Sequence, residues 1–383
     1  MPSTPIRQDV LTAARSVVVK IGTQLLTKPE PGQTSSAGGV TLDTRFIGSI
    51  AGQVAKLRTR GVRVTLVSSG AIGAGCAALG MAKRPTDVAE AQAVAAVGQR
   101  NLMTAWHTAF ARRKLGVGQV LLTRSDFDDR GRFLNIRNCV SRLHELDCVP
   151  ILNENDAVAV EELRFGDNDV LAGLTTNALR ADALLMLTVV DGLLDDQGNV
   201  IDRVDDVVGA LSAVRTDKSG WGSGGMASKL EAARVVTEAG EVAVVANGKA
   251  KDVVLRLLDG QTGIGTVFAP AARKLDARSR WIGLTVRPAG TVTVDNGAAK
   301  AITQRGKSLL ATGITAMTGR FERGDVLLVR DAAGKELGRG LTNYASDELR
   351  LIAGQQSDDF EKLLGRPGYT AVVHRDHLVL LGA

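Results

Sequence analysis

The chain has 383 residues, of which 44% are hydrophobic and 3% aromatic, and 47 Lys and Arg against 41 Asp and Glu give it a net charge of +6. This length exceeds the roughly 100 to 200 residues of one ordinary domain and predicts two domains. The scarcity of aromatic side chains argues against a surface that stacks single-stranded bases.

Cysteine spacing and the hydropathy pattern exclude further classes of protein. The three cysteines form no C-x-x-C pair, so we expect neither a disulfide framework nor a protein-held metal site. No apolar run resembles a secretion signal or a membrane span, and we therefore expect a cytoplasmic protein without a membrane partner. The four histidines form no ligand pattern and receive no role.

Short β-branched runs alternate with longer helical patterns from residue 16 to about residue 270. Apolar runs without alternation predict strands buried on both faces, and intervening helices predict parallel crossovers. The runs are SVVVKIG, VRVTLVSSG, VGQVLLT, CVPILNEN, ALLMLTVVDG and VAVVANG. We therefore expect an α/β fold in which an open, mainly parallel sheet lies between layers of helices.

A second composition follows, in which short strand-like runs (TVTV, DVLLV, TAVVH and LVLL) are joined by turns such as DNG and AAGK. This pattern predicts a smaller β-rich domain. We expect an N-terminal extension at 1–15, a catalytic domain at 16–275, a linker at 276–288 and the β-rich domain at 289–383. A Pro-, Gly- and Ser-rich segment at 28–39 predicts a loop.

The glycine-rich stretch GWGSGGMASKLEAA, residues 220–233, is a candidate phosphate loop. Its glycines fit G-x-G-x-x-G, but the polar segment before it is not the strand that a dinucleotide site requires, and no complete Walker A motif occurs. A flexible turn is the alternative. Lys229, however, lies in the first turns of a predicted helix, where free N–H groups and the helix dipole favour an anion. Phosphate is the ligand that this arrangement favours.

Polar residues follow several predicted strands, at the edge of the sheet where ligands bind in open α/β folds. Lys20 lies near the end of a buried run, where a charge is costly unless it reaches a site or a partner. VSSGAIGAG offers backbone amides, and NEND with GDND offers carboxylates and amides. Surface lysines, helix packing and solvated turns are the alternatives. Together the stretches predict one site that binds an amino-acid ammonium group and orients lysines.

These motifs together resemble the amino-acid kinase family. VVVKIGT, VSSGAIGAG, AAVGQ, LLTRSDFDDRGRFLN, VPILNENDAV, GDNDVL and GSGGMASKLEAA occur in the family's order. The segment PAGTVTVDNGAAKAITQRGKSLLATGI looks like the start of a PUA domain, a small fold of RNA-modifying enzymes. The 12 Lys and Arg against 11 Asp and Glu from Ala289 to Ala383 are far from the basic footprint of an autonomous RNA binder.

The resemblance implies roles for individual residues. It implies that Lys20 and Lys229 contact the transferring phosphoryl group and that Asp169 holds both lysines. It implies that the substrate glutamate is bound by Ser69, Gly70, Ala71, Asn153, Asp156 and Asn168. It implies that ATP is bound by Lys20, Thr188, Val189, Ser223, Gly224, Gly225, Met226, Ala227, Ser228 and Lys229. Two residues depart from the family pattern: Val189 stands where aspartate is common, and Arg164 where lysine is common.

The activity implied is transfer of the γ-phosphate of ATP, with Mg²⁺, to the side-chain carboxylate of L-glutamate, the entry step of proline synthesis. The resemblance also implies a homo-oligomer, with inhibition by proline and RNA binding left open. The first alternative is a kinase of the same fold with another acceptor, such as aspartate, N-acetylglutamate or a nucleotide. The second is an RNA-associated protein with a vestigial kinase half, and a nicotinamide dehydrogenase is weaker still because neither glycine match follows a strand.

Overall fold

The computed structural model describes residues 7–29, 40–159, 168–216, 225–272 and 274–381. The chain divides into two compact units, Met1–Lys274 and Leu275–Ala383, and each is described by itself. The expected domain boundaries stay a prediction. Several predictions concern residues outside the described ranges. They are residues 30–39 of the expected loop at 28–39, Arg164 between the NEND and GDND motifs, and Ser223 and Gly224 of the candidate phosphate loop.

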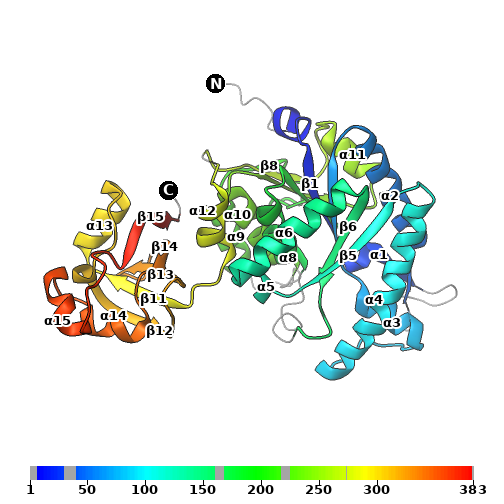
Figure 1. The fold of residues 1–383 in the computed structure, drawn as a ribbon. Helices are drawn as coiled ribbons and strands as arrows, with labels where there is room; N and C mark the ends of the chain where they lie inside the picture. Colours follow the sequence, from blue (N-terminus) through cyan, green and yellow to red (C-terminus); the bar gives the residue numbers. More distant parts are fainter. Residues whose placement is uncertain (1–6, 30–39, 160–167, 217–224, 273, 382–383) are drawn as a thin grey trace. The chain divides into compact units, whose positions relative to one another are not determined.

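The first unit is built on an eight-stranded sheet in the order β5-β6-β4-β1-β7-β9-β10-β8 (Figure 1). All its strand pairs are parallel except β9 with β10. The strands are β1 (Ser16–Ile21), β4 (Arg63–Ser68), β5 (Gly116–Leu122), β6 (Cys148–Glu154), β7 (Ala183–Thr188), β8 (Arg203–Val204), β9 (Val242–Asn247) and β10 (Thr266–Phe268). A separate hairpin pairs β2 (Thr27–Pro29) with β3 (Val40–Leu42).

Helices cover both faces of this sheet (Figure 1). One layer holds η1 (Arg7–Leu11), α2 (Thr44–Thr59), α4 (Val88–Ala111) and α11 (Val253–Leu258). The other holds α6 (Arg130–Glu145), α8 (Asn168–Leu179) and α10 (Gly225–Glu238). The remaining helices are α1 (Thr23–Leu26), α3 (Ala71–Leu79), α5 (Ser125–Asp128) and α9 (Val207–Thr216).

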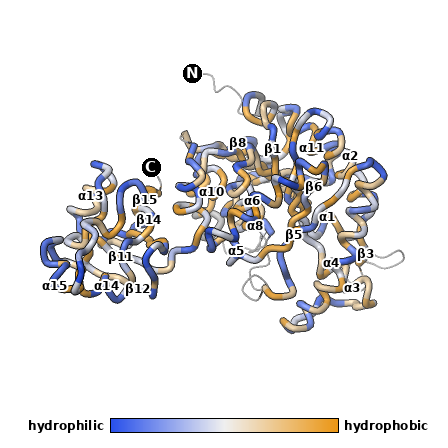
Figure 2. Tube along the Cα trace, viewed as in Figure 1, coloured by the Kyte–Doolittle hydropathy of each residue, from blue (hydrophilic) through white to orange (hydrophobic). Residues whose placement is uncertain are grey.

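The alternation of side chains along β1 decides which layer each residue meets. Val17, Val19 and Ile21 are fully buried in the core cluster that includes α2 and α4. Val18 and Lys20 are absent from that cluster and lie at the alternate positions, on the side of α8, which packs against β1. Figure 2 shows hydrophobic residues concentrated along the strands of the large sheet.

The α/β fold class is confirmed. All six predicted runs form strands of the large sheet, and they lie next to one another in the order β5-β6-β4-β1-β7-β9, joined by five parallel pairs. The central strands β1, β4, β6, β7 and β9 are buried on both faces by the two helical layers, whereas most residues of the edge strand β5 are partly or fully exposed. In the described part of the chain no helix is long and apolar enough to cross a membrane.

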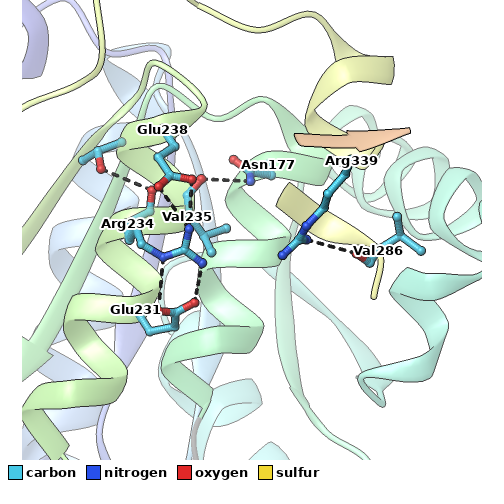
Figure 3. Close-up of polar contacts among 8 residues, drawn as sticks. Asn177, Glu231, Arg234, Val235, Glu238, Val286 and Arg339 are labelled. Atoms are coloured by element: carbon cyan, nitrogen blue, oxygen red, sulfur yellow. Dashed lines mark hydrogen bonds and ion pairs between the residues drawn. The ribbon is translucent and has the colours of Figure 1, made fainter. Parts of the chain in front are cut away.

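The second unit contains a five-stranded sheet in the order β12-β11-β13-β14-β15. Its strands are β11 (Gly290–Val294), β12 (Ile314–Gly319), β13 (Val326–Asp331), β14 (Glu336–Thr342) and β15 (Val373–Leu380). Its helices are α12 (Ala277–Arg280), η2 (Trp281–Thr285), α13 (Asn296–Arg305), η3 (Ala311–Gly313), α14 (Ser346–Ile352), η4 (Ser357–Asp359) and α15 (Phe360–Leu364). After η2, the carbonyl of Val286 accepts a hydrogen bond from Arg339 of β14 at 3.4 Å (Figure 3).

One expected turn in this unit is wrong. The DNG tripeptide at 295–297 begins a helix, because the Asp295 carboxylate accepts a hydrogen bond from the Ala298 amide at 2.7 Å and caps α13. The AAGK turn is confirmed between the antiparallel strands β13 and β14. The sequence patterns did not predict β12 or β14, whose alternating residues include glycines and exposed polar side chains.

A histidine of α6, His144, is partly buried against β4. The Nε2 atom of His144 lies 3.0 Å from the Thr65 hydroxyl, with which it shares a hydrogen bond. Burial, reinforced by the positive charges of Arg58 and Arg63, lowers the pKa of His144 from 6.5 to about 4. The native state therefore holds this imidazole neutral, whereas the unfolded chain protonates it near its ordinary pKa.

We expect the free energy of unfolding to decrease as the pH falls from 6.5 to about 4, since only the unfolded state binds the His144 proton there. Urea unfolding of the wild type and of His144→Gln, at pH 7.5 and pH 4.5, measures this. The variant should lose less stability than the wild type on acidification. His107→Gln, at an exposed position of α4, is the matched control and should follow the wild type. Equal pH dependence in all three proteins would contradict the assignment.

Candidate active site

Two lysines meet on one buried carboxylate at the carboxyl edge of the large sheet. The ammonium group of Lys20, from β1, lies 2.6 Å from Oδ1 of Asp169, and that of Lys229, from α10, lies 2.8 Å from Oδ2. The Asp169 side chain is fully buried, and the lysine side chains are 6% and 10% exposed. Buried charges are tolerated when they are paired in this way. The cluster as a whole keeps one net positive charge and favours an anion.

Local structure explains why these three side chains converge. Asp169 is the second residue of α8, where the positive end of the helix dipole stabilises a carboxylate. Lys229 lies one turn into α10, and its ammonium also donates to the Gly225 carbonyl at 2.9 Å. The Ser228 hydroxyl donates to Asp169 at 3.3 Å and so adds a further contact between α10 and α8.

The two helices that carry Asp169 and Lys229 are fixed to each other along their length. Asn177 of α8 donates from Nδ2 to the Val235 carbonyl of α10 at 3.1 Å (Figure 3). At Gly173 of α8, an added Cβ would lie 3.2 Å from the Ala232 carbonyl oxygen. Within α10, Arg234 forms ion pairs with Glu231 and Glu238 (Figure 3). The ion-pair geometry is therefore preorganised by helix packing.

A cavity of about 340 Å³ opens at the same edge of the sheet. Its wall includes all six residues expected to bind the substrate: Ser69, Gly70, Ala71, Asn153, Asp156 and Asn168. Asn168 directly precedes Asp169, so the cavity and the lysine cluster are joined through the first turn of α8. Thr23 and Glu154, which follow predicted strands, also line the cavity, whereas the sequence did not predict the lining residues Thr27, Cys76, Lys83 and Arg84.

Backbone N–H groups face this cavity from the N-terminus of α3. Gly70 precedes the helix with φ of 102°, a left-handed conformation that favours glycine. The Ser69 amide donates to the Ile21 carbonyl at 3.2 Å, which ties this turn to the end of β1. A helix N-terminus offers unsatisfied N–H groups and positive potential, and it suits a ligand carboxylate.

Side-chain amides form a hydrogen-bonded chain along the cavity wall. Nδ2 of Asn168 donates both to Oδ1 of Asn153 and to the Ser69 hydroxyl oxygen, at 2.9 Å in each case. Nδ2 of Asn153 in turn donates to Oε1 of Gln99 at 2.8 Å. Gln99 was not among the predicted site residues, although it ends the AAVGQ motif.

Asp156 and Arg84 bring opposite charges to the cavity wall. Burial raises the pKa of the Asp156 carboxyl from 3.8 to about 6, and the positive charge of Arg84 opposes that rise. The side chain is therefore ionised at neutral pH but close to its titration range. An ionised carboxylate in a partly buried cavity attracts an ammonium group.

Apart from Lys20 on β1, the described residues expected to bind the nucleotide lie at the end of β7 and at the start of α10. Thr188 ends β7, and Val189 packs partly buried against the main hydrophobic core. Gly225, Met226, Ala227 and Ser228 form the first turn of α10. The packing of Val189 gives a structural reason for a hydrophobic residue at this position.

Comparison with known proteins agrees with this architecture. The amino acid kinase family model matches residues 15–247, which hold both lysines and every strand of the large sheet except β10. The chain belongs to the amino acid kinase family. A PUA domain model matches residues 290–364, within the second unit. The resemblance read from the sequence motifs is thus confirmed.

Within the amino acid kinase family, the chain is similar over nearly its full length to proteins named glutamate 5-kinase. That of Acaryochloris marina is 43% identical over 379 residues, which cover 96% of this chain and 100% of the relative. That of Chromohalobacter salexigens is 43% identical over 382 residues, 98% of each chain. That of Gloeobacter violaceus is 45% identical over 375 residues, 96% of this chain and 99% of the relative.

Removing the carboxylate that both lysines share should destabilise the fold. We expect Asp169→Asn to lower the free energy of unfolding by about 3 kcal/mol or more, because two buried ammonium groups lose their countercharge. Urea unfolding without nucleotide measures the change. Asp259→Asn breaks an exposed ion pair with Arg60 and serves as the control, with a loss below about 1 kcal/mol. A similar loss in both variants would refute the central role of Asp169.

Proposed function

We propose that this protein is a glutamate 5-kinase, which transfers the γ-phosphate of ATP to the side-chain carboxylate of L-glutamate and releases ADP. The proposal rests on two neighbouring features at the carboxyl edge of the large sheet. A cavity bearing a carboxylate, amides and a hydroxyl adjoins two buried lysines held on Asp169. The names of relatives aligned over nearly the whole chain support the same activity.

The cavity matches the charges of glutamate. Asp156 pairs with the α-ammonium group, and the backbone amides at Gly70 and Ala71 receive a carboxylate at the start of α3. Ser69, Asn153 and Asn168 supply neutral hydrogen-bonding groups between these two charges. An amino acid bound in this way has its side chain left to reach the lysine cluster.

The reaction requires no general base, because the acceptor carboxylate is already ionised near neutral pH. One carboxylate oxygen attacks the γ-phosphorus, the bond from that phosphorus to the bridging oxygen of ADP breaks, and an acyl phosphate forms. The ammonium groups of Lys20 and Lys229 stabilise the negative charge that spreads over the transferring group. Asp169 holds both ammonium groups in place before substrate arrives.

The nucleotide is bound between the end of β7 and the start of α10. In this proposal Thr188 and Val189 border the nucleoside, and residues from Ser223 to Lys229 surround the phosphates, with the N-terminus of α10 directed at them. Bound together with the nucleotide, Mg²⁺ would supply positive charge that neutralises part of the phosphate charge. We assign it no protein ligand, because both oxygens of Asp169 are engaged by lysines.

Further properties belong to the same proposal. They are a cytoplasmic location, a role in the first step of proline synthesis, assembly into a homo-oligomer and feedback inhibition by proline. The PUA domain at 290–364 raises RNA as a partner. Its near-neutral charge favours a weak contact with RNA. A kinase of the same fold with another acceptor is the alternative function.

A hydroxamate assay tests the activity directly, since hydroxylamine traps an acyl phosphate. We expect a signal that requires ATP, Mg²⁺ and glutamate together. In Lys229→Ala the turnover should fall at least about a hundredfold while glutamate binding changes little, because the lysine acts on the transferring group. Lys56→Ala, at an exposed position of α2, is the control and should keep full turnover. Signal with another acid but not with glutamate would refute the proposed acceptor, and full turnover of Lys229→Ala would refute the lysine's role.

Glutamate affinity should depend on pH through Asp156. Because the pKa of this carboxyl is raised to about 6, we expect affinity to increase as the pH rises from 5 to 7 and the carboxylate ionises. Calorimetric titration with glutamate, without nucleotide, measures it. In Arg84→Ala the midpoint should move to higher pH, since the charge that opposes the shift is gone.

Lys83→Ala is the matched control for this titration, because Lys83 also lines the cavity but does not act on the Asp156 carboxyl. Its midpoint should equal that of the wild type. Glutamate affinity that stays constant from pH 5 to pH 7 would exclude pairing between Asp156 and the ammonium group.

A further inference from the structure

Gln99 reaches the candidate site from α4, a helix that lines none of the cavity itself. Gly98 makes this approach possible, because an added Cβ there would lie 1.8 Å from the Ala71 carbonyl oxygen and 2.3 Å from the Gly75 amide nitrogen. The backbones of α4 and α3 therefore touch. This contact brings the next residue, Gln99, to the buried side chain of Asn153 on β6, at 2.8 Å.

The polarity of the Asn153 amide is fixed by a neighbour that can only donate. The backbone N–H of Glu154 donates to Oδ1 of Asn153 at 2.9 Å. Oδ1 must therefore face that N–H, and Nδ2 must face Gln99. The Gln99 atom that accepts the hydrogen bond from Nδ2 of Asn153 is Oε1. Its Nε2 is buried and has no hydrogen-bond partner within the described ranges, so nothing else competes for the orientation of this amide.

The same polarity passes on to Asn168 and Ser69. Oδ1 of Asn153 faces Nδ2 of Asn168, which also donates to the Ser69 hydroxyl oxygen. Asn168 is 9% exposed, and its Oδ1 is buried without a hydrogen-bond partner in the part of the chain that the structure describes. Because Asn168 lines the cavity, this oxygen is an acceptor left for a ligand, and Ser69 can turn its hydroxyl hydrogen toward the same ligand.

We propose that Gln99 is a positioning residue for acceptor specificity, which stabilises the polarity that the Glu154 N–H sets along the chain Asn153–Asn168–Ser69, so that the cavity presents a hydrogen-bond acceptor at Asn168. The proposal rests on the proposed function and deepens it. Without the Gln99 acceptor, Nδ2 of Asn153 loses its partner, and the orientation in which Oδ1 faces Asn168 is no longer favoured on both sides. A reversed Asn168 would present N–H groups to the substrate.

The ligand group that senses this polarity is the α-ammonium of the acceptor amino acid. An ammonium group only donates, so it requires the Asn168 oxygen beside the Asp156 carboxylate and is rejected by an NH₂ group in its place. A dicarboxylic acid without the ammonium group, glutarate, gains nothing from the acceptor. Gln99 therefore controls how strongly the site prefers glutamate to glutarate, through residues that it contacts and without touching either molecule.

The test is the ratio of kcat/KM for glutamate to kcat/KM for glutarate, measured by ADP release. Gln99→Met removes the acceptor and keeps an unbranched side chain of similar size. We expect the ratio to fall about tenfold or more, since a hydrogen bond to a charged group is lost, with the KM for ATP unchanged. Gln99→Glu keeps an oxygen at the same place and should restore the ratio to within about threefold of the wild type.

Gln92→Met is the matched control, because it makes the same substitution two turns earlier on α4 and should leave the ratio unchanged. An unaltered ratio in Gln99→Met, or a ratio in Gln99→Glu as low as that of Gln99→Met, overturns the proposal. If Gln99→Met does not fold, Gln99→Glu decides alone: a folded variant that has lost the preference overturns it, and one that keeps it supports it. Failure of the proposed function itself differs from all of these, since the wild type would then phosphorylate neither acid.

Discussion

The carboxylate of Asp169, shared by Lys20 and Lys229, is the interaction on which the rest of the site depends. It joins β1, α8 and α10, three elements far apart in sequence, through two short ion pairs in a buried environment. Each lysine alone would be a costly buried charge, and the carboxylate alone would be equally costly. Together they give a cluster that is one positive charge in excess before any anion binds. The packing of α8 on α10 keeps this excess charge at a fixed place, which is the condition for electrostatic stabilisation of a phosphoryl group.

The amide chain on the cavity wall solves a different problem. A charged group attracts an oppositely charged ligand over a long distance. A side-chain amide, in contrast, presents its donor and its acceptor at fixed places only when its NH₂ group and its oxygen cannot exchange positions by rotation. Asn153 is held between a backbone N–H and the Gln99 oxygen, and the order passes to Asn168. The cavity therefore has directionality as well as charge. In the proposed function, Asp156 and the α3 N-terminus supply most of the affinity, and the ordered amides supply the discrimination.

Much of this arrangement could be predicted from the sequence, for identifiable physical reasons. Unbroken β-branched runs mark buried parallel strands, and the carboxyl ends of such strands meet at one edge, so Lys20, Asn153 and Thr188 could be placed together before any coordinates. The DNG tripeptide shows the limit, because Asp-Asn-Gly favours both a hairpin turn and a helix start, and only the following α13 residues decide. Gln99 was missed because its role depends on two helix backbones in contact, which Gly98 permits but no local pattern reveals.

The alternation of side chains along β1 has a consequence for folding. Lys20 faces the layer of α8 and α10, while Val19 and Ile21 face the opposite core. A slip of β1 by one residue against β4 and β7 would turn the ammonium group into the hydrocarbon packed around α2 and would leave Asp169 facing an isoleucine. Lys20 thus also stabilises the correct strand register. A chain paired in the wrong register is destabilised on both faces of the sheet. One face buries an ammonium group without a countercharge, and the other buries a carboxylate that is not neutralised.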